Sequence, residues 1–120
     1  MSEDIAEVTR KFVESMPGKV RELQRVLEEV VQQLGQKGEA DWQPLYALAH
    51  RLAGACGTYG FDELSELARH LEDGIQLKCL QGMEAKMASV FLQRWYAAFA
   101  TRARTSYADS NGAGGARGAA

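Results

Sequence analysis

Residues 45–61 read LYALAHRLAGACGTYGF, and this stretch is the clearest sign of how the chain folds. Its apolar residues recur at intervals of three and four, the spacing that places side chains on one face of an α-helix. That face consists of Leu45, Leu48, Ala49, Leu52 and Cys56. Since a helix advances about 100° per residue, His50 points about 140° away from this face, toward solvent. The stretch therefore predicts an amphipathic helix, from about Trp42 to Thr58, with a histidine on its exposed side.

The residues around His50 are unusually small for the exposed side of a helix. Ala47, Gly54 and Gly57 share that side, and Ala53 lies on its flank, where charged and amide side chains are usual. Each glycine inside a helix lowers stability by about 0.8–1 kcal/mol relative to alanine. Two explanations stay open: close packing against the N-terminal helix or a partner chain, or an open surface on which something large approaches His50.

The same periodicity predicts helices before residue 42. We expect a short helix over residues 5–16 and a longer one over residues 17–34, because Ser15-Met16-Pro17 interrupts the pattern. Ser15 can cap the second helix, and Pro17 fits its first turn, where no N–H is needed. The stripe expected to face the core in the short helix is Ile5, Val8, Phe12 and Met16.

Two more helices are predicted after Thr58. Gly60 suits a left-handed helix end, and a helix opens at Phe61 or Asp62 and continues to about Ile75. A last helix begins near Met83, with an expected core stripe of Met83, Met87, Val90, Phe91, Trp95 and Ala98 or Phe99. The fold class is thus all-α: an up-and-down antiparallel four-helix bundle with an extra short N-terminal helix, spanning residues 1–106. Residues 107–120 are rich in glycine and alanine, which predicts a disordered tail.

Composition excludes several classes of function. The chain has 120 residues, which is the length of one domain. Its net charge of -2 lacks the surplus of basic residues that nucleic-acid binding requires. No apolar run approaches the ~20 residues that span a bilayer, so we expect no membrane span. The N-terminus does not resemble a signal peptide. The two cysteines of the chain are too few for a disulfide scaffold. Together these features favour the cytoplasm.

Residues 49–72 resemble the signature of histidine phosphotransfer (HPt) domains, which is His-x-Leu-Lys-Gly followed by small residues and a second glycine. His50, Leu52, Gly54 and Gly60 fall in register with it. The resemblance implies that His50 accepts a phosphoryl group from the aspartate of one receiver domain and passes it to another. It implies as partners response-regulator receiver domains and a sensor or hybrid histidine kinase. No cofactor is expected in this chain, because magnesium would belong to the receiver, and no ATP site is seen.

One position departs from this family pattern. Family members often have a lysine three residues after the histidine, where its charge helps to bind the phosphoryl oxygens, whereas this chain has Ala53. Arg51 points about 100° away from His50, and Arg69 is expected near the height of His50 on the next helix. We expect Arg69 or Arg51 to supply the positive charge in place of that lysine. Glu72 is expected on the flank of the histidine, where family members often have a polar residue. Gly57 and Ala47 would extend a flat docking face around Gly54.

The other reactive side chains suggest no chemistry of their own. His70 is expected on the surface, Cys56 in the core and Cys79 near a helix end. Neither cysteine has an adjacent base, and no metal-ligand spacing is present, so we expect no metal site and no enzyme activity beyond phosphoryl carriage.

Two other functions remain open at this point. The Ala/Gly face could bind a receiver or a helix without phosphoryl chemistry, which would make the chain an interaction module. A homodimer could also pack through Ala47, Gly54 and Gly57, although we expect a monomer.

Overall fold

The computed structural model describes residues 5–112 of the chain, and the side chains of residues 5–106. This part contains four helices and no strand: α1 (Ile5–Lys37), α2 (Gln43–Thr58), α3 (Asp62–Gln76) and α4 (Ala85–Gly112). The predicted all-α class is therefore confirmed. The segment from residue 77 to residue 84, which joins α3 to α4, is the longest connection in this part of the chain.

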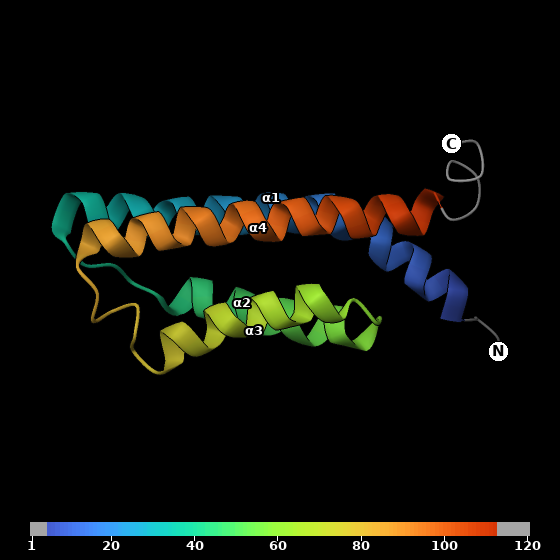
Figure 1. The fold of residues 1–120 in the computed structure, drawn as a ribbon, viewed down its shortest axis with the longest axis horizontal. Helices are drawn as coiled ribbons and strands as arrows, with labels where there is room; N and C mark the ends of the chain where they lie inside the picture. Colours follow the sequence, from blue (N-terminus) through green and yellow to red (C-terminus); the bar gives the residue numbers. More distant parts are fainter. Residues whose placement is uncertain (1–4, 113–120) are drawn as a thin grey trace.

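The helices lie in two pairs (Figure 1). The long helices α1 and α4 lie side by side, and the shorter helices α2 and α3 form the second pair below them, with the most extensive contact between any two elements. The colours in Figure 1 run right to left along α1 and α3, and left to right along α2 and α4. α2 packs against α1 and α3, so its remaining side is uncovered.

The predicted break at Ser15-Met16-Pro17 is wrong, because α1 is continuous through Pro17. The hydroxyl of Ser15 does not cap a new helix but donates a hydrogen bond to the carbonyl oxygen of Phe12, at 2.7 Å. A proline inside a helix removes one backbone hydrogen bond and bends the axis. Phe12 and Met16 before Pro17, and Leu23 after it, are all buried, so packing on both sides of the proline holds the helix together. The start of α1 is inclined to the rest of it (Figure 1).

Local signals set the ends of α2 and α3. The carboxylate of Asp41 accepts a hydrogen bond from the backbone N–H of Gln43, at 3.1 Å, and so satisfies one of the free amides in the first turn of α2. At the other end Gly60 has a φ of 84°, as predicted for a left-handed helix end. The backbone N–H of Phe61 then donates to the carbonyl oxygen of Cys56, at 2.8 Å. This tight turn places α3 directly beside α2.

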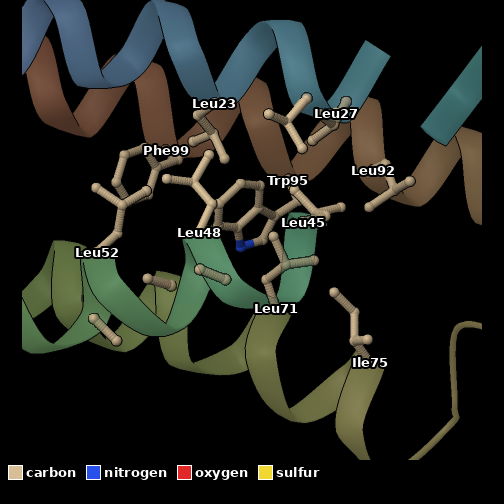
Figure 2. Packing of buried hydrophobic residues seen from close by; sticks show 14 of the residues in the cluster. Leu23, Leu27, Leu45, Leu48, Leu52, Leu71, Ile75, Leu92, Trp95 and Phe99 are labelled. Carbon is tan, nitrogen blue, oxygen red and sulfur yellow. The ribbon is translucent and has the colours of Figure 1, made fainter. Parts of the chain in front are cut away.

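The core lies between the two helix pairs (Figure 2). Apolar side chains from all four helices meet there, and the indole N–H of Trp95 donates to the carbonyl oxygen of Leu67, at 2.8 Å, which ties α4 to α3. The labelled members are Leu23 and Leu27 from α1, Leu45, Leu48 and Leu52 from α2, Leu71 and Ile75 from α3, and Leu92, Trp95 and Phe99 from α4. α2 thus has a firmly buried face, and this fixes which of its residues face outward.

Two predicted core stripes are partly wrong. In α4 the buried stripe is Ala88, Leu92, Trp95, Phe99 and Ala103, whereas Met87, Val90 and Phe91 are exposed. α4 is apolar on several sides near its start, so periodicity alone does not fix which side packs inward. At the start of α1, Ile5 and Val8 are exposed, because no other element covers the end of that long helix. α4 also continues to Gly112, further than expected, and residues 113–120 of the predicted tail lie outside the described residues.

Candidate phosphoryl-transfer site

His50 lies on the uncovered side of α2. Its side chain is 67% exposed, although its neighbours in the chain, Leu48, Ala49 and Leu52, are buried in the core. The buried face anchors the helix and leaves the imidazole in solvent. The structure therefore places a histidine on a rigid element where a partner can reach it.

Glu72 fixes the orientation of the His50 ring. The Nδ1 atom of His50 and the Oε2 atom of Glu72 are 2.6 Å apart, and the Glu72 side chain is only 13% exposed. Because an ionised carboxylate only accepts hydrogen bonds, Nδ1 carries the proton and donates it. In the neutral ring the lone pair is then on Nε2, the atom that points away from Glu72. The predicted neighbour on the flank of His50 is present, and it leaves one ring nitrogen free to react.

Tyr46 supports the ring from the preceding turn of α2. The centroids of the Tyr46 and His50 rings are 6.3 Å apart, with an angle of 16° between their planes. Sequence analysis missed this residue, although its position four residues before His50 is the spacing at which helix side chains meet. Glu72 and Tyr46 together restrict the rotation of the imidazole.

Gly54 and Gly57 lie in different surroundings. A Cβ atom added at Gly54 would meet nothing within 4 Å, so this position is open to solvent. A Cβ atom added at Gly57 would lie 3.2 Å from the hydroxyl oxygen of Ser65 on α3. Close packing of α3 is thus sufficient to explain Gly57, whereas no contact within the described chain explains Gly54.

Ser65 ties α3 to α2 at the next turn. Its hydroxyl donates a hydrogen bond to the carbonyl oxygen of Ala53, at 2.8 Å, and Ser65 is itself buried. Ala53, which we expected on the flank of the site, is only 3% exposed. Sequence analysis also missed Ser65, whose polar side chain within a buried helix stripe was the signal to look for.

The remaining predicted site residues form no hydrogen bond or ion pair with His50 that we observe among residues 5–106. Ala47 is half-buried, and Arg51 and Arg69 are exposed. The Nη2 atom of Arg69 lies 3.4 Å from the hydroxyl oxygen of Ser65, to which it donates a weak hydrogen bond. Of the predicted set, Glu72 contacts the histidine directly, and Gly54 lies one turn along on the open side.

The comparisons with known proteins agree with this geometry. The model of the Hpt domain family matches residues 7–102 of the chain, which cover α2, α3 and most of α1 and α4. The chain belongs to the Hpt domain family. Hpt domains carry phosphoryl groups in two-component phosphorelays and act as phosphocarriers rather than as enzymes. No curated protein and no solved structure matches the chain.

The other reactive groups of this Hpt domain lie apart from His50. Cys56 is buried in the core, and this burial raises the pKa of its thiol to about 11; Cys79 and His70 are exposed. No group of three or more potential metal ligands occurs within the described part of the chain. None of the helices described here is long and apolar enough to cross a membrane.

Proposed function

We propose that this Hpt domain accepts a phosphoryl group on His50 from the aspartate of one receiver domain and passes it to the aspartate of another. The observation that carries the proposal is the pairing of an exposed imidazole with Glu72 through Nδ1 at 2.6 Å. That pairing leaves Nε2 as the nucleophile on the solvent side. The direction of each transfer is set by which phosphorylated partner is in excess.

Each transfer is a displacement at phosphorus. The lone pair of Nε2 attacks the phosphorus atom of the aspartyl phosphate, a bond forms between nitrogen and phosphorus, and the bond from phosphorus to the aspartate oxygen breaks. The aspartate leaves as a carboxylate. The ring gains positive charge in this step, and Glu72, which holds the Nδ1 proton, stabilises it. The reverse sequence returns the phosphoryl group to a second receiver.

The shape of this face supports the proposed partners. Gly54 leaves a clear surface beside His50, so that a receiver can bring its phosphoaspartate close to the imidazole. Phosphoryl transfer depends mostly on positioning and charge stabilisation, and the receiver supplies magnesium. We expect response-regulator receivers and a sensor or hybrid histidine kinase as partners, a monomeric state, and the cytoplasm as the compartment.

Phosphotransfer from labelled receivers tests the proposal. A panel of receivers phosphorylated with ³²P would be mixed with the wild-type protein, with His50→Gln and with His70→Gln. The second variant is a matched control, because His70 is also an exposed histidine and lies on α3. We expect acid-labile, base-stable label on the wild type and on His70→Gln, and none on His50→Gln.

Three outcomes would contradict the proposal. Label on His50→Gln at the wild-type rate would exclude His50 as the acceptor. Loss of label in His70→Gln alone would assign the chemistry to the other histidine. Measurable receiver binding without any label would favour an interaction module that performs no chemistry.

A further inference from the structure

The negative charge of Glu72 beside His50 is unfavourable for a phosphoryl group on that histidine. This inference rests on the proposed function. Glu72 places a carboxylate 2.6 Å from Nδ1. The incoming phosphoryl group spreads negative charge over its oxygens in the transition state, and positive side chains are the usual way to stabilise it. A cation is therefore needed on this chain to offset Glu72.

The register between α2 and α3 shows which cation lies at the right height. His50 pairs with Glu72, and Gly57, two turns further along α2, faces Ser65, two turns earlier on α3. The two helices run in opposite directions. Arg69, three residues before Glu72 on α3, therefore lies at the same height as Ala53, three residues after His50 on α2. That level is about 4.5 Å along the axis from His50, at 1.5 Å per residue. An arginine side chain is long enough to cover that distance.

The surroundings of Arg69 leave its charge free to act. Arg69 is an exposed residue, and its guanidinium donates one weak hydrogen bond, to Ser65 at 3.4 Å. No carboxylate lies within ion-pair distance of it among residues 5–106. The side chain at this level of α2 is that of Ala53, which is small, buried and uncharged. Ser65 is itself fixed by its bond to the carbonyl oxygen of Ala53.

The alternative cation is Arg51, on α2 itself. It is also exposed and has no ion-pair partner in the described part of the chain. However, it follows His50 directly and points about 100° away around the helix. Glu72 and Arg69 instead lie three residues apart on α3 and share one face of that helix.

We infer that Arg69 is the phosphoryl-binding residue of this site, and that it moves from Ser65 to the oxygens of the phosphoryl group on His50 during transfer. Arg69 forms no covalent bond and exchanges no proton in this step. It donates guanidinium hydrogen bonds to two phosphoryl oxygens, which suits its planar, forked geometry. The cation thus comes from α3, across the helix pair, rather than from α2.

Two phosphoryl donors separate binding of the phosphoryl group from docking of a partner. Phosphoramidate, a small donor that phosphorylates imidazoles directly, needs no docking surface, whereas a phosphorylated receiver needs one. We expect Arg69→Ala to slow labelling of His50 by about tenfold with both donors, the effect of losing one charged hydrogen bond. Arg69→Lys should recover part of that loss. Arg94→Ala, the same change of charge on α4, should label at the wild-type rate.

The outcomes discriminate between the candidates. If Arg69→Ala labels as fast as the wild type with phosphoramidate, or if Arg51→Ala shows the tenfold loss instead, the inference about Arg69 is overturned while His50 stands as the acceptor. A wild-type protein that takes no label from any donor would overturn both proposals.

Discussion

Gly54 and Gly57 lie on the same helix, one turn apart, and the structure gives them different reasons to be glycine. Gly57 faces α3, where a Cβ atom would lie 3.2 Å from the Ser65 hydroxyl. Gly54 faces open space beside His50. The first glycine lets two helices approach each other, and the second leaves a surface empty. A glycine that reduces helix stability without any packing reason is therefore a better sign of a docking surface than glycine content alone.

A bulky charge at Gly54 should produce the largest functional effect. Gly54→Lys places a long side chain on the open side of His50, so a receiver can no longer approach. We expect transfer from a phosphorylated receiver to fall about ten- to hundredfold, which corresponds to about 1.4–2.7 kcal/mol of steric strain. Rapid-quench kinetics would measure this, and the melting temperature should not fall. An unchanged transfer rate would show that the partner docks elsewhere.

A bulky side chain at Gly57 should instead affect the fold. Gly57→Leu brings a Cβ atom to 3.2 Å from the Ser65 hydroxyl, which must then shift from its place against α2, and overpacking of this kind costs about 1–3 kcal/mol of unfolding free energy. Urea denaturation followed by circular dichroism would measure the change. If the free energy of unfolding stays the same, the distinction between the two glycines fails.

Removal of the partner of His50 should have a moderate effect on transfer. Glu72→Leu deletes the acceptor of the Nδ1 proton, so the ring samples both tautomers and rotates more freely. We expect transfer to slow about fivefold, equivalent to one modest hydrogen bond. Glu72→Gln keeps an oxygen acceptor and should retain more of the rate. Equal rates for both variants and the wild type would mean that Glu72 does not position the ring.

The smallest expected effect is a gain in stability. Gly54→Ala adds a methyl group into open space, so it should raise the free energy of unfolding by roughly 0.5–1 kcal/mol through helix propensity alone. The same denaturation experiment measures it. A loss of stability would indicate a contact at Gly54 and remove the argument that function maintains the glycine.

Helical periodicity was sufficient to predict α2 and α3, because each has one clear apolar stripe and a marked end such as Gly60. It failed where the local signal was ambiguous. Pro17 suggested a break, yet burial of Met16 before it and Leu23 after it keeps α1 continuous. α4 is apolar on several sides, so Met87 and Phe91 were assigned to the core although they are exposed.

At the site, the residue pattern of α2 was sufficient to predict the features that depend on α2 alone. The exposed position of His50 follows from its angle to the buried face of α2. Contacts between helices depend on register, which a single helix pattern does not contain. Glu72 was found through the family resemblance, whereas the contact of Ser65 with Ala53 and Gly57 required the structure. The explanation of Gly57 was open for the same reason.

The most direct test of the account is to identify which ring nitrogen carries the phosphoryl group. The protein, labelled with ¹⁵N at histidine, would be phosphorylated and examined by ¹⁵N and ³¹P NMR. Since Nδ1 of His50 is held by Glu72, the account predicts a bond from phosphorus to Nε2 of His50. Phosphorylation at Nδ1 of His50, or at His70, would contradict it.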